Sequence, residues 1–327
     1  MCGIKYLLDR DGQYRDTQYN TLIATEGSTN LLRNDYFISL GFMADSQLAD
    51  FVAEEEKYNP IWEQNDIFRL ATGLQEPLYT PLPYEQLIAS DENSTIEASG
   101  TSGTQYSYNC VNASERSSYS VIYRAPVDGL YCATTKFTGV NNVSAYHNGE
   151  YLFERNIKAR SMFSLGWFAA GDEIKLVYFI DAGGQGTFSA DVELMNDSVF
   201  RRGHAELADE PWELTKVTDT TLTGIITARQ DGLFYTSVPY EPGWTATVDG
   251  EEVELAATFD PSNPSVKLTD AVVSFPLSAG THAITLHYSA PGLTTGWLIS
   301  ASALLLFGGL LYLRRKEYTL FPDPEEE

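Results

Sequence analysis

The stretch FYTSVPYEPGWTATVDGEE, residues 234–252, contains three backbone signals within a short length of chain. It begins with an apolar run typical of a strand, bends at Pro242-Gly243-Trp244, and ends in the turn Asp249-Gly250. Asp-Gly is favoured at two-residue hairpin turns because both central residues need a positive φ. The stretch therefore predicts antiparallel strands joined by a tight turn, which is typical of an all-β fold.

The strand and turn signals, but not the Pro-Gly-Trp bend, occur once more about one hundred residues earlier in the chain. Three segments recur in the same order and at nearly constant spacing, which indicates an internal repeat. The matching segments are Asp128-Gly129-Leu130-Tyr131 with Asp231-Gly232-Leu233-Phe234, Asn148-Gly149-Glu150 with Asp249-Gly250-Glu251, and AGDEIKLVY (170–178) with AGTHAITLHY (279–288).

Each repeat predicts a strand after Asp-Gly, a hairpin with a type I′ turn, and a closing strand after Ala-Gly. In the closing strands, apolar residues alternate with polar or smaller ones, as in a sheet with one buried face. We therefore expect a mainly β protein with two tandem antiparallel β-sandwich domains, jelly-roll-like, at residues 92–200 and 223–292.

Outside the two sandwiches, the sequence before residue 292 predicts one small α+β segment and two linkers. Residues 1–75 mix strand and helix patterns, and Asn59-Pro60 predicts the start of a helix that ends at Gly73. Three prolines place a linker at residues 76–91, and a second linker is expected at residues 201–222.

A run of 21 uncharged residues, 293–313, predicts one transmembrane helix. Trp297 and Tyr312 lie near its two ends, where interfacial aromatic residues anchor a span. Arg314, Arg315 and Lys316 follow directly, so the positive-inside rule places residues 314–327 in the cytoplasm as a tail. Residues 1–292 are then expected outside the cell membrane. Because the N-terminus lacks a signal-peptide pattern, we expect an upstream polytopic membrane domain, in the same parent protein or in a separate chain.

Charge and cysteine content narrow the functional classes. A formal charge of −24 argues against nucleic acid as a partner, because phosphate binding needs a basic surface. Cys110 and Cys132 could form a disulfide or act as small core residues, and the core role is favoured. The spacing of cysteine and histidine predicts neither a metal site nor a cofactor.

The motifs VPYEPGWTATVDGEEVEL (238–255) and FPLSAGTHAITLHYSAPGLTTGWLIS (275–300) resemble the C-terminal end of the bacterial YfhO-like membrane protein family. ISLGFM (38–43) and NPIWEQNDIFRLATG (59–73) resemble earlier segments of its extracellular region, and the resemblance covers most of residues 1–315. It implies a polytopic membrane protein of the GT-C glycosyltransferase type, acting on a cell-envelope polymer such as lipoteichoic acid. The catalytic acid of GT-C enzymes lies on an early loop of the membrane domain, which has no counterpart here. The resemblance therefore implies an extracellular accessory region with no catalytic residue of its own.

Tyr240 and Trp244 are the candidate carbohydrate-binding residues. Both lie on the Pro-Gly-Trp elbow, where an aromatic ring could stack on a sugar or could instead fill the sandwich core. Trp167 is expected in the core of the first sandwich. A membrane-anchored carbohydrate-binding module and a structural cell-surface spacer remain alternatives to the accessory-region reading.

Overall fold

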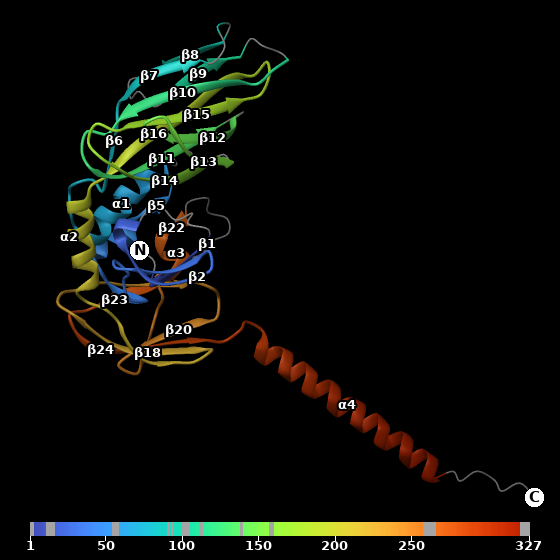
Figure 1. Ribbon diagram of the computed structural model, residues 1–327. Helices are drawn as coiled ribbons and strands as arrows, with labels where there is room; N and C mark the ends of the chain where they lie inside the picture. Colours follow the sequence, from blue (N-terminus) through green and yellow to red (C-terminus); the bar gives the residue numbers. More distant parts are fainter. Residues whose placement is uncertain are drawn as a thin grey trace, which may run out of the picture.

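The computed structural model describes residues 3–10, 17–53, 59–89, 92, 94–99, 105–110, 114–137, 140–156, 160–257 and 266–320. Most of these residues form antiparallel strands, which confirms the mainly β prediction. Figure 1 shows one sandwich at each end of a body, two helices between them, and a long C-terminal helix that projects away. The helices between the sandwiches are α1 (Pro60–Thr72) and α2 (Asp197–Ala208), and the projecting helix is α4 (Leu293–Leu320).

The first sandwich consists of two facing sheets. One sheet has the order β13-β12-β15-β10-β7, and the other has the order β14-β11-β16-β9-β8, with β6 paired to β16. Alternate residues of the strands face inward, so that Tyr119, Leu176 and Tyr178 are buried in the core between the sheets. The strands are β6 (Tyr79–Pro81), β7 (Tyr84–Ala89), β8 (Thr95–Ser99), β9 (Gln105–Asn109), β10 (Ser117–Arg124), β11 (Gly129–Phe137), β12 (Val140–His147), β13 (Glu150–Asn156), β14 (Arg160–Phe168), β15 (Glu173–Ile180) and β16 (Gln185–Met195).

The larger sheet of the second sandwich repeats one sheet of the first strand for strand, and the second sheet is shorter, with the order β23-β19-β4. The larger sheet has the order β17-β18-β24-β20-β21, which matches β7-β10-β15-β12-β13 of the first sandwich read in the opposite direction. The core of the second sandwich contains Phe234, Phe275 and Ile284, together with Trp212. The strands are β17 (Glu213–Val217), β18 (Thr221–Ala228), β19 (Gly232–Pro239), β20 (Trp244–Val248), β21 (Glu251–Val253), β23 (Val272–Leu277) and β24 (Gly280–Tyr288).

One strand of the second sandwich comes from the N-terminal part of the chain. In the first sandwich, the last strand β16 lies beside β11, whereas after β24 the chain leaves the second sandwich and enters α4. The equivalent place beside β19 is occupied by β4 (Gly41–Ala44), with Phe42 opposite Tyr235. Residues 1–75 are therefore structurally joined to the second sandwich by strand pairing.

The two repeats hold their hairpins with the same polar contacts. Asp128 accepts a hydrogen bond from the Ala170 amide at 2.7 Å, and Asp231 accepts one from the Ala279 amide at 2.8 Å. Asn148 and Asp249 have φ values of 50° and 54°, as the predicted type I′ turns require. Their side chains accept from the amides of the matching closing strands, Glu173 and Ala283, at 2.8 Å each.

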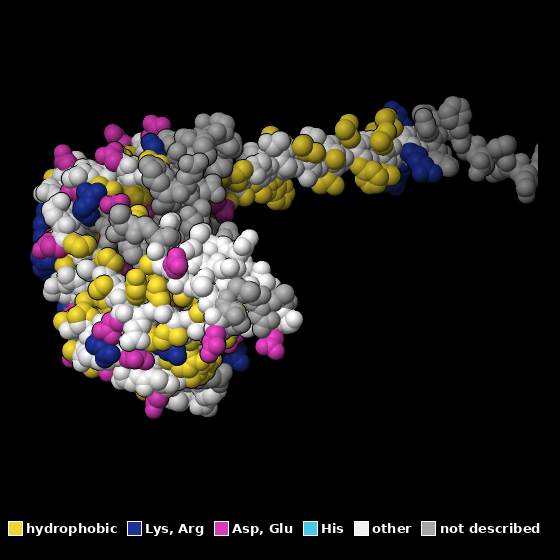
Figure 2. Space-filling view, turned by 90° about the horizontal axis from the view of Figure 1, so that it is seen from above, with side chains coloured by type: hydrophobic (Ala, Val, Ile, Leu, Met, Phe, Trp, Pro, Cys, Tyr) yellow, Lys and Arg dark blue, Asp and Glu magenta, His cyan; other side chains and the backbone are white. Residues whose placement is uncertain are grey.

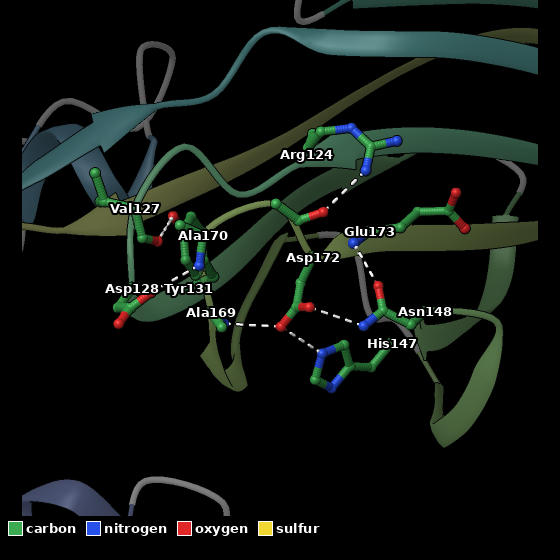
Figure 3. A network of polar contacts seen from close by, with 11 residues as sticks. Arg124, Val127, Asp128, Tyr131, His147, Asn148, Ala169, Ala170, Asp172 and Glu173 are labelled. Atoms are coloured by element: carbon green, nitrogen blue, oxygen red, sulfur yellow. Dashed lines mark hydrogen bonds and ion pairs between the residues drawn. The ribbon is translucent and has the colours of Figure 1, made fainter.

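A histidine–carboxylate pair reinforces each hairpin, and Figure 3 shows the first of them. There, Asp172 accepts from Asn148 Nδ2 and the Ala169 amide, both at 2.8 Å, and contacts His147 Nε2 at 2.7 Å. These hydrogen bonds lower the pKa of Asp172 to about 2, and the bond from Asn148 has the largest effect on this pKa. In the second repeat, the partners are Asp249 and His282, at 2.8 Å.

The N-terminal part supplies a small sheet and the helix that sequence predicts. Asn59 caps α1 by accepting from the amides of Ile61 and Trp62, and Gly73 ends it with a φ of 72°. The small sheet has the order β1-β3-β2, and β5 pairs with β22. The elements are β1 (Tyr6–Arg10), η1 (Thr17–Tyr19), β2 (Asn20–Glu26), β3 (Thr29–Asn34), η2 (Ser46–Asp50), β5 (Val52–Ala53), β22 (Val266–Lys267) and α3 (Leu268–Ala271).

The segments that sequence reads as linkers contain regular structure. Residues 76–91 include β6 and β7, which belong to the two sheets of the first sandwich. Residues 201–222 include most of α2 and all of β17, and Trp212 between them is buried in the second core. Their proline and charge content predicts linkers, although these segments also contain apolar residues that pack into the cores.

Candidate functional site

The Pro-Gly-Trp elbow holds the end of the last strand where the chain leaves the second sandwich. Gly243 has a φ of 130°, a conformation that residues with a side chain rarely adopt. A side chain there would also collide with the carbonyl oxygen of Ser289, which follows β24. The Gly243 carbonyl accepts a hydrogen bond from the Ser289 amide at 2.9 Å. The elbow and the exit strand are thus fastened directly to each other.

The aromatic residues of the elbow continue this contact. The rings of Trp244 and Tyr288 lie with centroids 5.2 Å apart, and Tyr288 donates to Glu241 Oε2 at 3.2 Å. Trp244 and Tyr240 are both half-buried and pack against the second core. The structure thus brings the two predicted carbohydrate-binding residues together on one elbow, with part of each side chain turned into the protein.

Beside this elbow, the chain passes from β24 into the apolar helix after only residues 289–292. Within α4, residues Leu293–Lys316 form a candidate membrane span with a mean hydropathy of 1.8, and their side chains are exposed. Trp297 and Tyr312 lie toward opposite ends, and Arg314, Arg315 and Lys316 follow Leu313. Figure 2 shows hydrophobic side chains along this helix and basic ones gathered near its far end. Residues 321–327 of the predicted tail lie outside the described part of the chain.

A cavity of about 620 Å³ lies between the N-terminal sheet and helices α1 and α2. Its size is in the range of small-molecule sites. It is lined by Ile4, Leu7, Asn34, Tyr36, Ile38, Gln64, Ile67, Phe68, Leu78, Tyr79, Met195, Phe200, His204, Leu207, Tyr235 and Leu268.

The polar side chains of this cavity already have protein partners. Asn34 donates to the Ile4 carbonyl at 3.1 Å, and Gln64 donates to Met162 Sδ at 2.7 Å. His204 packs edge-on against Tyr36, with ring centroids 5.1 Å apart. The cavity thus offers mainly apolar walls, and neither Tyr240 nor Trp244 lines it.

Two buried carboxyl groups lie on β16, and the sequence did not predict them as candidate site residues. Asp191 and Glu193 lie two residues apart on β16 and therefore share the face of the sheet that is turned away from the core. Burial raises the pKa of Asp191 to about 7, and burial together with the charge of Asp191 raises that of Glu193 to about 8. Thr134 donates to Glu193 Oε1 at 3.2 Å, and Oε2 has no hydrogen-bond partner among the described residues. The alternation of acidic and apolar residues in SADVEL (189–194) was the available signal.

The other candidate chemistry-bearing residues take structural positions. Cys110 and Cys132 are buried in two different cores and form no disulfide with each other, in agreement with the favoured interpretation as core residues. Trp167 is 37% exposed, so the prediction of a core position was wrong; it precedes the inward-facing Phe168 and therefore points outward. The described residues contain no group of acidic, histidine or cysteine side chains that could hold a metal ion.

Comparison with solved structures gives distant likenesses. A family 11 carbohydrate-binding module from Clostridium thermocellum, in complex with a mixed-linked tetrasaccharide, is 11% identical with a TM-score of 0.20, over 39% of this chain and 94% of the module. A cycloisomaltooligosaccharide glucanotransferase from Paenibacillus sp. is 9% identical with a TM-score of 0.21, over 61% of this chain and 45% of that chain. A calcium-binding mutant of β-glucuronidase 2 from Bacteroides uniformis is 11% identical with a TM-score of 0.20, over 62% and 28%. At these TM-scores the likenesses carry no argument.

Comparison of the sequence with protein families is decisive. The search of curated proteins yields no significant match. The model of the family described as bacterial membrane protein YfhO matches residues 1–300, which includes both sandwiches and the elbow. The chain therefore belongs to the YfhO family of bacterial membrane proteins.

Proposed function

We propose that residues 1–292 form an extracellular accessory region of a polytopic, glycosyltransferase-like membrane protein. In this proposal, the region stands on α4 and serves the glycosylation of a cell-envelope polymer such as lipoteichoic acid, while a hexosyltransferase site lies in an upstream membrane domain. Family membership and the candidate membrane span support the proposal.

The observation that carries it is the short, fastened junction between the second sandwich and α4. Only residues 289–292 separate β24 from the helix, and the Ser289 amide is bonded to Gly243. The helix begins immediately, since the amide of Gly296 donates to the Gly292 carbonyl at 2.8 Å. Such a junction restricts how far the sandwiches can swing relative to the membrane, which suits a region that positions a polymer for a membrane-embedded active site.

The test loosens this junction in the full-length protein. A ten-residue Gly-Ser spacer inserted between Ser289 and Ala290 should lower the sugar content of the envelope polymer without changing the membrane level of the protein. The matched control carries the same spacer at Gly27, a turn residue with open space around it. Unchanged glycosylation with the spacer at residue 289, or an equal loss in the control, would refute a positioning role.

The orientation is tested separately. The basic residues 314–316 favour a cytoplasmic C-terminus, so a fluorescent protein fused after Glu327 should fold and fluoresce, and an exported-only reporter enzyme should stay inactive there. The reverse pattern would place residues 1–292 in the cytoplasm and remove the basis of the proposal.

Carbohydrate binding at Tyr240 and Trp244 is a second candidate function. The placement of both rings on one elbow, beside the exposed Glu241 carboxylate, favours it. Loss of saccharide binding in Trp244→Ala, measured at a temperature at which the variant is still folded, is the expected result. Unfolding at a lower temperature without an effect on binding would assign Trp244 to packing.

A further inference from the structure

Two rows of side chains cross the outer face of the sheet β13-β12-β15-β10-β7. Their chain neighbours Ala145, Leu176 and Val121 face the core, so strand alternation turns both rows outward. The strand register gives the first row as Tyr151, Tyr146, Lys175, Ile122 and Gln86, and the second as Glu154, Ser144, Val177, Ser120 and Ile88.

The first row presents an aromatic pair at one edge of the sheet. The rings of Tyr146 and Tyr151 lie with centroids 5.8 Å apart and planes at 73°, and Tyr151 is 59% exposed. Lys175 Nζ lies 5.8 Å from the Tyr146 ring centroid, within the distance of a cation–π contact. Lys175 thus holds Tyr146, and Tyr146 in turn packs against the exposed Tyr151 ring. A tyrosine held in this way can stack on a ligand at low cost in side-chain entropy.

The second row presents a carboxylate held in place next to this pair. Asn142 Nδ2 donates to Glu154 Oε1 at 2.7 Å, and Ser144 donates to Oε2 at 3.4 Å. Glu154 itself is exposed, so its remaining lone pairs can accept hydrogen bonds from a ligand.

The side chains in the middle of this face are buried, although they belong to none of the described core clusters. Ser144 is 2% exposed, while Ile122 and Val177 are each 8% exposed, and the two apolar residues belong to none of the four described core clusters. The groups of these rows that are open to a ligand at the β13 edge are therefore the exposed residues Tyr151 and Glu154. At a strand spacing of about 4.8 Å, the five strands extend over about 19 Å, which is long enough for an oligomer.

An exposed ring with its hydroxyl and a fixed, exposed carboxylate match the alternating C–H and O–H surfaces of a sugar chain. A chain with a formal charge of −24 disfavours polyanions, so an uncharged ligand is favoured. We propose that this outer face, with Tyr151 and Tyr146 as the stacking platform and Glu154 as the hydrogen-bonding group, binds a neutral oligosaccharide. The site lies on the sandwich distant from α4 in Figure 1.

The inference rests on the proposed extracellular role, and it gives that region a site for a neutral glycan, as distinct from the polyanionic backbone of a lipoteichoic acid. It is tested with the full-length protein in lipid nanodiscs, which avoids sugar-based detergents. Cellotetraose, maltotetraose, chitotetraose and β-1,4-galactotetraose are titrated to 10 mM, and binding is followed by saturation-transfer NMR and calorimetry. At least one tetrasaccharide should bind. Tyr151→Ala should weaken that binding about tenfold, Glu154→Gln should weaken it to a similar extent, and Tyr151→Phe should retain it.

The matched control is Trp62→Ala, which removes an aromatic side chain that is also 59% exposed but lies on α1. It should leave the affinity unchanged. The proposal is overturned if no tetrasaccharide binds, if Trp62→Ala and Tyr151→Ala lower the affinity equally, or if only Trp244→Ala abolishes binding. Failure here leaves the spacer and reporter results at the α4 junction intact, whereas a reversed topology with binding preserved would refute the extracellular role alone.

Discussion

At Gly243, both the backbone conformation and the close packing require a glycine. Its positive φ excludes most side chains, and the carbonyl of Ser289 occupies the space that a Cβ would need. Gly250, seven residues later, also has a positive φ, of 90°, but has open space around it. The two glycines separate conformational strain from steric collision.

We expect Gly243→Ala to cost more free energy of unfolding than Gly250→Ala. A positive φ costs a side chain about 1–2 kcal/mol even in the left-handed helical region, and at Gly243 the larger φ and the collision both add to the cost. Thermal unfolding of both variants measures the difference. Equal shifts in melting temperature would show that the elbow yields without cost and does not fasten the exit strand.

Asp191 and Glu193 should make stability fall as pH rises. A carboxyl with a raised pKa keeps its proton in the folded state after the unfolded chain has released its own, so its contribution is complete below about pH 4. It is lost as the pH rises through about 7 for Asp191 and about 8 for Glu193. The urea midpoint should therefore decrease between pH 5 and pH 8.5.

Glu193→Gln should flatten this pH dependence, because the amide resembles the protonated acid in shape. Glu150→Gln, on the exposed strand β13, is the matched control and should leave the pH dependence as it is. A variant at Glu193 that keeps the full decrease would show that its carboxyl is not the titrating group.

At the scale of elements, local signals and distant pairings differ in what sequence can reveal. The helix α1 begins and ends where Asn59-Pro60 and Gly73 predict, and both Asn-Gly and Asp-Gly turns have the predicted backbone. These features depend on a few neighbouring residues. The elbow likewise identified the family, although whether Trp244 binds sugar stays a prediction.

The place of β4 could not be predicted in the same way. GFMA (41–44) has the pattern of any short buried strand, and nothing near it specifies β19 as the neighbour. The exposed pair Tyr146–Tyr151 was overlooked for a related reason, since a register shift at Leu152 decides which residues share a face. Such choices are made by packing across the whole sheet.

Phe42→Ala should destabilise the second sandwich by about 3–5 kcal/mol, as expected for a fully buried phenylalanine. Phe42 is 1% exposed and contacts the Tyr235 ring at a centroid distance of 5.6 Å. Phe37→Ala, at a position 37% exposed, is the control and should cost far less. Hydrogen exchange resolved by peptide measures the effect, and equal protection of β19 in both variants would argue against a structural role for β4.

For the whole molecule, α4 is the candidate anchor in the bilayer. Leu305 lies near the middle of the candidate span and is 78% exposed in the protein. Leu305→Arg should reduce insertion, because arginine at the centre of a span costs about 2.5–3.5 kcal/mol on insertion scales. Leu305→Phe serves as the control. Sodium carbonate extraction of membranes separates the outcomes, and full retention of the arginine variant would show that other segments anchor the protein.

The pairing of β4 with β19 has a consequence for the order of folding. Phe42 and Tyr235 face each other although they are about 190 residues apart, and contacts of such long separation form late. The described strands of the first sandwich lie within residues 79–195, so this sandwich can fold before the rest of the chain has been synthesised. In the second sandwich, β4 has an unpaired edge until β19 has been synthesised. During synthesis, the second sandwich, which joins α4, thus closes after the first and is the one more in need of protection from wrong partners.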